Sequence, residues 1–217
     1  MKFSTLSCIT VSFLTTVAVS PVLAITGEVT QFTSPERVNS RVQEIAQFDG
    51  STPEQERSQL LQQANTLSNQ GDLAGAEEKL RELIKKYPRY SFGHFELGNV
   101  LSQQDKTEDA IKAYQEAIRL NSNHALAYNG IGLLYAKENR WEEAITEYEK
   151  ALKINPNYGD ALANLALALL QTNQRNEAIA SLEKALDVFK SQNRNQRVYQ
   201  IEQILQQIQT LDAPEIS

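Results

Sequence analysis

The stretch Ala125–Tyr158, ALAYNGIGLLYAKENRWEEAITEYEKALKINPNY, decides the fold because its residue pattern returns every 34 positions. Shifting it by one period places Gly132 on Gly98 in one direction and on Ala166 in the other. Two positions of every period hold only glycine or alanine: Ala64, Ala76, Gly98, Ala110, Gly132, Ala144, Ala166 and Ala178. This self-similarity predicts an array of four equivalent units, at 57–90, 91–124, 125–158 and 159–192.

Each window is predicted to fold as two short helices. In the third window Tyr128, Ile131 and Tyr135 recur at i, i+3 and i+7, which is the spacing of one apolar helix face. Between the two helices, one position holds only residues that tolerate left-handed backbone: Gly71, Asp105, Asn139 and Asn173. Asp72 and Thr107 then follow as helix N-cap candidates.

The glycine and alanine pairs have a physical reason. Each pair, such as Gly132 with Ala144, is expected where the two helices of one hairpin cross, because a larger side chain would push the backbones apart. One hairpin cannot cover its own apolar faces, so stacking must supply the core and the ends need caps. A chain of 217 residues, 41% hydrophobic and poor in glycine and proline, agrees with one such helical domain.

The third window resembles the tetratricopeptide repeat (TPR) in its spacing of aromatic, small and proline residues: Tyr128, Ile131, Gly132, Tyr135, Ala144, Tyr148, Ala151 and Pro156. The resemblance spans 57–192 and implies an all-α fold, a right-handed α-solenoid of four helix-turn-helix hairpins. Three windows depart from the family pattern, the first because Gln63 and Ala64 stand where leucine and glycine are usual. His94 stands at an aromatic position, and Lys190 replaces the terminal proline, so the last hairpin's second helix is expected to run on.

The chain continues beyond both ends of the predicted repeat array, where the terminal hairpins need to be covered. Residues 193–217 are predicted to be a capping helix and short tail, because 195–211 carries one apolar face: Val198, Ile201, Leu205 and Ile208. The rival interpretation is a dimerisation seam that makes the solenoid a structural spacer in a homodimer. Residues 25–56 carry Pro35, Gly50 and Pro53 and are interpreted as a low-order spacer, with a possible short helix around Val38.

The first 24 residues are interpreted as a secretory signal peptide. Lys2 precedes an apolar run, Pro21 breaks it, and small residues end the segment at Ala24. The alternative is an uncleaved membrane anchor. We therefore expect export, to the periplasm or to another exported space such as the thylakoid lumen, and no membrane contact after cleavage. Cys8 is the only cysteine, so the mature chain would have no disulfide.

The TPR resemblance implies a concave groove, lined by the first helix of each hairpin, that binds a protein or peptide. The family's groove positions hold apolar and amide side chains in this sequence: Leu61, Asn65, Phe92, Phe95, Asn99, Gln103, Asn129, Leu133, Lys137, Ala163, Asn164, Leu167 and Gln171. Amides offer both donors and acceptors, which suit the backbone of an extended peptide. The alternative is that Phe95 and Leu167 only pack the core.

A clamp for a C-terminal carboxylate, known in this family, is not expected. The positions that would carry its lysines and arginines hold other residues: Leu61, Asn65, Phe92, Glu96 and Leu126. The net charge of −6 also disfavours nucleic acid as a partner, because phosphate binding needs a basic face.

No pattern in the sequence indicates catalysis. The two histidines, His94 and His124, are 30 residues apart without metal-ligand spacing, and His94 is interpreted as a core residue. Gly-rich phosphate loops and nucleophile elbows are absent from the sequence. We therefore expect an exported scaffold or assembly factor that uses no cofactor or metal and is not an enzyme.

Overall fold

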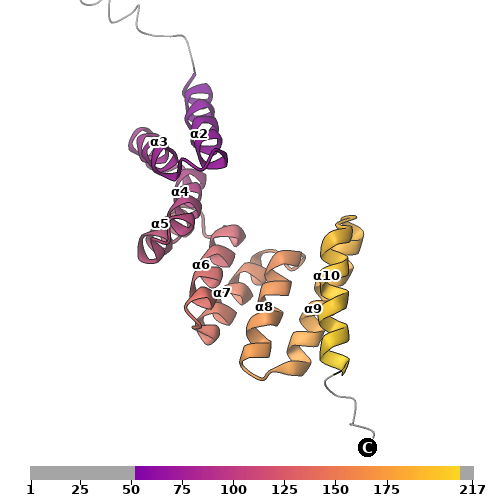
Figure 1. Ribbon diagram of the computed structural model, residues 1–217. Coiled ribbons are helices and arrows are strands. Elements are labelled where there is room, and N and C mark those ends of the chain that lie inside the picture. Colours follow the sequence, from indigo (N-terminus) through magenta and orange to yellow (C-terminus); the bar gives the residue numbers. More distant parts are fainter. Residues whose placement is uncertain (1–51, 211–217) are drawn as a thin grey trace, which may run out of the picture. The chain divides into compact units, whose positions relative to one another are not determined.

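The computed structural model describes residues 52–210, a range that contains nine α-helices and no strand. In chain order they are α2 (Pro53–Asn69), α3 (Leu73–Lys86), α4 (Ser91–Gln103), α5 (Thr107–Leu120), α6 (Ala125–Lys137), α7 (Trp141–Ile154), α8 (Gly159–Gln171), α9 (Arg175–Ser191) and α10 (Asn195–Thr210) (Figure 1). The predicted signal segment, Cys8, the possible helix around Val38 and the chain's last seven residues lie outside this range. Among the described helices, none has the length and apolarity to cross a membrane.

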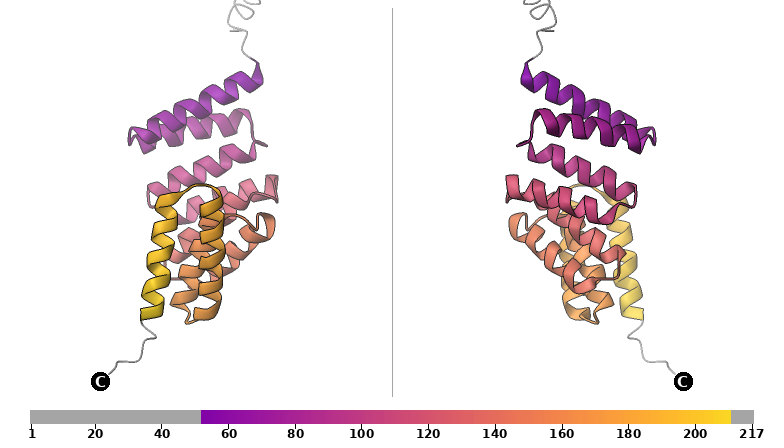
Figure 2. Two further views of the ribbon diagram at one scale, coloured as in Figure 1. Left: turned by 90° about the vertical axis from the view of Figure 1, so that its right-hand side faces the viewer. Right: turned by 90° about the vertical axis from the view of Figure 1, so that its left-hand side faces the viewer.

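Consecutive helices pack as four antiparallel pairs, α2 with α3, α4 with α5, α6 with α7 and α8 with α9. The second helix of each pair then packs against the first helix of the next pair, and α10 packs on α9 (Figure 2). The first helices also touch one another, α4 with α6 and α6 with α8. The fold is therefore an all-α solenoid of four hairpins and a capping helix, as predicted from the 34-residue period.

The turns within the hairpins confirm the predicted left-handed positions. Asp105, Asn139 and Asn173 have φ near 60°, and Gly71 has φ of 84°. The next residue donates its N–H back into the preceding helix, as from Lys106 to the Leu101 carbonyl at 3.0 Å, which satisfies a helix-terminal carbonyl. The repeated turn residues therefore set where every first helix stops.

One of the two predicted caps is right and the other is wrong. The Asp72 carboxylate accepts from the Gly75 N–H at 2.9 Å and caps α3. Thr107 is already the first residue of α5, whose N-cap residue, Lys106, makes no side-chain capping bond. A threonine beside a turn is thus ambiguous by one residue, and only the backbone path decides its role.

The first helix begins four residues before the predicted start of the repeats, so 53–56 are not spacer. The Thr52 hydroxyl accepts from the Gln55 N–H at 3.2 Å, while the Gln55 side chain accepts from the Thr52 N–H at 2.7 Å. This is a capping box, and Pro53 occupies the first helical position, where proline is favoured.

The core runs along the seams between hairpins. Every alanine of the four crossing pairs has an exposed fraction of zero, and Gly98 and Gly132 are buried beside them. The second helix of the last hairpin does run on, with 17 residues in α9 against 14 in α7. Ile201 and Ile208 of α10 are buried in the same cluster as Phe189, so the predicted seam packs within its own chain. This observation leaves the dimerisation interpretation without its apolar face.

Candidate functional site

The surface formed by α2, α4, α6 and α8, here called the first-helix wall, carries three of the four large hydrophobic side chains that are exposed in the described residues. Leu126, Leu133 and Leu167 are 44%, 47% and 45% exposed, and Tyr199 of α10 is 64% exposed. Leu126 and Leu133 are seven residues apart and share one face of α6, and Leu167 is the equivalent of Leu133 one period later. In the described part of the chain, no second helix exposes a large hydrophobic residue in this way.

A hollow of about 550 Å³ lies on the N-terminal half of this wall, between α2 and α4. Here called the amide pocket, it is lined mainly by polar side chains: Asn65, Ser68, Asn69, Glu96, Asn99, Val100, Ser102, Gln103, Tyr114 and Leu133. Its size falls within the range of about 300–1,000 Å³ that is usual for ligand clefts.

The floor of the amide pocket is fixed by a tyrosine that reaches it from the second helix. A Cβ on Gly98 would lie 2.6 Å from the Tyr114 ring, and one on Gly130 would lie 2.7 Å from the same ring. Only glycine therefore leaves room for the ring between α4 and α6. The Tyr114 hydroxyl donates to Asn99 Oδ1 at 2.8 Å, and Asn99 Nδ2 donates to Glu96 Oε2 at 3.2 Å.

The electrostatics of this pocket are set by Glu96, the one charged residue in its lining. Burial raises the pKa of Glu96, and the hydrogen bond from the Asn99 amide only partly opposes that shift. Burial and the nearby Glu96 carboxylate both raise the pKa of Tyr114 well above its usual value. The tyrosine therefore stays protonated and keeps its hydroxyl as a donor to Asn99.

A second hollow, of about 370 Å³, lies at the C-terminal end of the wall, between α8 and α10. Here called the cap groove, it combines apolar side chains with glutamines: Ala163, Asn164, Leu167, Arg197, Tyr199, Gln200, Ile201, Gln203, Ile204 and Gln207. The charge in this region is already compensated. Arg197 donates to Asp160 at 2.7 Å and stacks on the Phe189 ring, with 5.3 Å from Cζ to the ring centroid.

Comparisons with known proteins agree with this geometry. Family models described as tetratricopeptide repeat match residues 60–90, 95–159 and 135–198. The chain belongs to the tetratricopeptide repeat family. Its function at the level of the family is that of a protein-interaction scaffold.

Solved structures extend the likeness over most of the TPR array. One described as "Crystal structure of MamA" is 25% identical with a TM-score of 0.59, covering 74% of this chain and 95% of its own. A second, "Crystal structure of MamA protein", is 26% identical with a TM-score of 0.56, covering 73% and 82%. MamA 41-end from Desulfovibrio magneticus RS-1 is 16% identical with a TM-score of 0.57, covering 75% and 98%, and shares the fold. No curated protein sequence matched the chain.

The wall of this TPR protein brings together seven of the thirteen predicted groove residues in two hollows. Asn65, Asn99, Gln103 and Leu133 line the amide pocket, and Ala163, Asn164 and Leu167 line the cap groove. The exposure of Leu167 contradicts the alternative that it only packs the core. Leu61 and Phe92 are half-buried against the core, Lys137 forms an ion pair with Asp105, and Gln171 is exposed.

Two predicted groove residues have structural roles instead. Phe95 is buried, with its ring centroid 4.9 Å from that of His124 and 5.8 Å from that of Tyr114, so the alternative that it packs the core is correct. Asn129 is also buried and accepts from Asn164 Nδ2 at 3.0 Å, which ties α6 to α8. The family positions lie on the first helices, but the sequence could not show that neighbouring helices cover these two residues.

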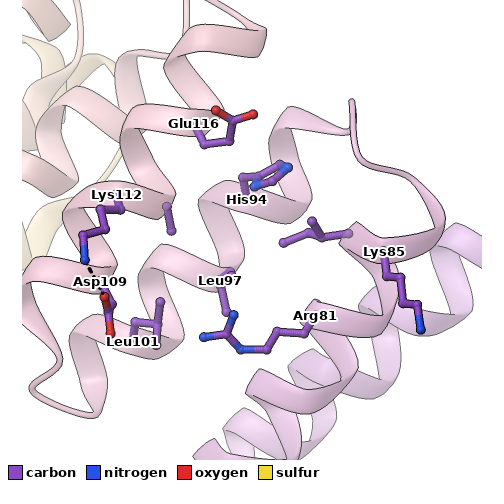
Figure 3. A pocket seen from close by; sticks show the side chains of 10 residues that line it. Arg81, Lys85, His94, Leu97, Leu101, Asp109, Lys112 and Glu116 are labelled. Atoms are coloured by element: carbon purple, nitrogen blue, oxygen red, sulfur yellow. Dashed lines mark hydrogen bonds and ion pairs between the residues drawn. The ribbon is translucent and has the colours of Figure 1, made fainter.

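The opposite face of the TPR array has a hollow of about 490 Å³ between α3 and α5, in which Figure 3 shows Lys112 paired with Asp109. Its other acid, Glu116, pairs with Arg119, and Arg81 pairs with Glu77. The prediction that His94 is a core residue is wrong, because His94 is half-buried and lines this hollow, whereas His124 is buried. These satisfied ion pairs indicate a solvated outer surface.

Proposed function

We propose that this TPR protein is an exported scaffold that holds an extended segment of a partner protein along its first-helix wall. The supporting observation is the row of leucines, Leu126, Leu133 and Leu167, that the wall leaves in water. Scattered exposed leucines are ordinary on a protein surface. These three are different because they follow one face of α6 and continue at the equivalent position of α8.

The two hollows that flank this row suit the rest of an extended segment. Amide side chains in the amide pocket can both donate to and accept from a peptide backbone, while the cap groove offers apolar contact beside Leu167. Binding would thus use apolar side chains for affinity and amides for register. The proposal is one of binding and assigns no catalytic step to the wall.

Peptide selection tests the wall directly. Twelve-residue peptides would be selected from a random phage library on the purified protein, and their affinities measured again with Leu133→Ser combined with Leu167→Ser. Each leucine is about half exposed, so covering it contributes about 1 kcal/mol. The double variant is therefore expected to bind about 10- to 30-fold more weakly.

The matched control replaces two exposed residues of the second helices, Glu149→Ser with Lys184→Ser, whose charges cancel. This variant should bind the same peptides with unchanged affinity. Equal losses in both double variants, or a loss only in the control, would contradict the wall as the binding surface.

Export is the second element of the proposal and rests on the order of residues in 1–24. Expression of the full chain in a Gram-negative bacterium, followed by fractionation and intact-mass measurement, tests it. We expect periplasmic protein whose first residue is Ile25. A cytoplasmic product that retains Met1–Ala24 would contradict export, and an uncut membrane-bound product would support the anchor alternative.

A further inference from the structure

The amide pocket contains a carboxylate that no cation of the described chain balances. Other charges of the wall have ion-pair partners: Lys137 pairs with Asp105, and Asp160 pairs with Arg194 and Arg197 at 2.9 and 2.7 Å. Glu96 differs, because its hydrogen bond in the described structure comes from the neutral amide of Asn99. A half-buried carboxylate without a counter-ion is costly to maintain, so its position is a candidate for function.

The carboxylate is held in place rather than left to rotate freely. Tyr114, wedged beside two glycines, donates to Asn99, and Asn99 in turn donates to one oxygen of Glu96. That chain of bonds fixes Asn99 with its amide nitrogen toward Glu96. The second carboxylate oxygen, Oε1, has no hydrogen bond within the described residues and remains available to a ligand.

We propose that the amide pocket binds a cationic side chain, lysine or arginine, of the partner segment, with its charge against Glu96. This inference rests on the proposed function of the wall and names the chemistry of the residue that enters the pocket. An ammonium or guanidinium group would donate to Glu96 Oε1 and to amide oxygens of the lining. An anionic group would instead be repelled, because the pocket lining provides no positive charge to receive it.

The neighbourhood of Glu96 adds a second requirement on the ligand. Leu133 forms the edge of the same pocket and is 47% exposed, so an apolar side chain next to the cation would cover it. Lysine and arginine also carry apolar stems that can lie along such an edge while the charged head reaches the acid. The preferred segment is therefore a basic residue beside a large apolar one.

The test uses peptides selected as above on the wild-type protein. Selected sequences should be enriched in lysine or arginine at one aligned position, next to a large apolar residue. In the tightest lysine peptide, replacing that lysine by norleucine should lower affinity about 10-fold, as expected for the loss of a charge-assisted hydrogen bond. With Glu96→Gln, which keeps an acceptor for Asn99, the two peptides should bind within about 2-fold of each other.

Glu149→Gln is the matched control, since it removes one exposed acid from a second helix and should keep the 10-fold preference. If the Glu96→Gln protein does not fold, the preference of the wild-type protein for the lysine peptide over the norleucine peptide is measured at increasing salt concentration instead. That preference should shrink as salt rises from 0.05 to 0.5 M, while norleucine-peptide binding changes little.

The possible failures of this experiment are distinguishable. Peptides that depend on Leu133 and Leu167 but lack a basic residue, or a lysine preference unchanged by Glu96→Gln, would overturn this inference and leave the proposed function standing. Peptides indifferent to both leucines would overturn the proposed function and this inference with it.

Discussion

The two halves of the first-helix wall share one scaffold and differ in what they show to solvent. In the second hairpin Tyr114 packs on Gly98, and in the third Tyr148 packs on Gly132, with the same close approach. One residue after each glycine the halves diverge. Asn99 is half-buried in the amide pocket and bonded to Tyr114, whereas Leu133, its equivalent 34 residues later, is exposed at the edge of that pocket.

This divergence shows where recognition is encoded in a repeat array. Residues that set helix packing must recur, since each hairpin needs the same contacts with its neighbours. The residue that follows the glycine lies on the wall, where helix packing does not require one residue type. A change there alters the ligand chemistry of one repeat without changing the fold, so a polar half and an apolar half can be joined in one wall.

The largest expected effect comes from filling the space beside the tyrosines. Gly98→Ala would place a Cβ 2.6 Å from the Tyr114 ring, and Gly132→Ala would place one 2.5 Å from the Tyr148 ring. Each should lower the free energy of unfolding by about 1–3 kcal/mol, measured by urea denaturation. Only Gly98→Ala should also weaken the preference for a basic peptide. An equal loss of that preference in both variants would contradict the claim that only the half of the wall with Gly98 and Asn99 selects a basic residue.

A smaller effect is expected from removing one hydroxyl. Tyr114→Phe leaves Asn99 Oδ1 without its donor and should lower the free energy of unfolding by about 1 kcal/mol. It should also reduce the lysine preference, because Asn99 is then free to turn away from Glu96. Tyr148→Phe, in the half where Leu133 replaces the asparagine, should leave that preference unchanged. A Tyr114→Phe protein with full preference would show that the hydroxyl does not position the pocket.

The smallest expected effect is a gain in the free energy of unfolding, where the two preceding changes cause a loss. Burial raises the pKa of Glu96 in the folded protein, so the folded state binds more protons than the unfolded state between the two pKa values, and wild-type stability falls as pH rises through that window. Glu96→Gln removes this titration. It should be slightly more stable than wild type above the folded pKa and lose that advantage as pH falls. Denaturation at several pH values, with Glu149→Gln as control for net charge, measures the difference.

The period of the sequence predicted the scaffold well, for a physical reason. The helix crossings and the left-handed turns depend on local residue types that recur every period, such as Ala144 and Asn139. The length of α9 goes with a visible departure from the repeat, Lys190 in place of proline. The predicted start of the repeats is wrong at α2 because Pro53 is as typical of a linker as of a first helical turn, although Thr52 and Gln55 form a recognisable capping box.

The candidate site was predicted only in outline. Family positions identified Asn65 and Asn99, but burial of Phe95 and Asn129 depends on how closely the next hairpin approaches, which no local pattern states. In the sequence, Glu96 is notable only as a family groove position that lacks a cation. Its importance depends on its depth and on the absence of a counter-ion in its surroundings, both of which are properties of the packed structure.

Site-specific photocrosslinking in the native compartment tests the central claim most directly, because it captures a partner whatever its identity. A photoreactive phenylalanine analogue would replace Leu133 or Leu167 on the wall, and Glu149 or Glu183 on the second helices as controls. The account predicts a crosslink to the same partner protein from both wall positions and none from the controls. Crosslinks to that partner from the second helices, with none from the wall, would contradict it.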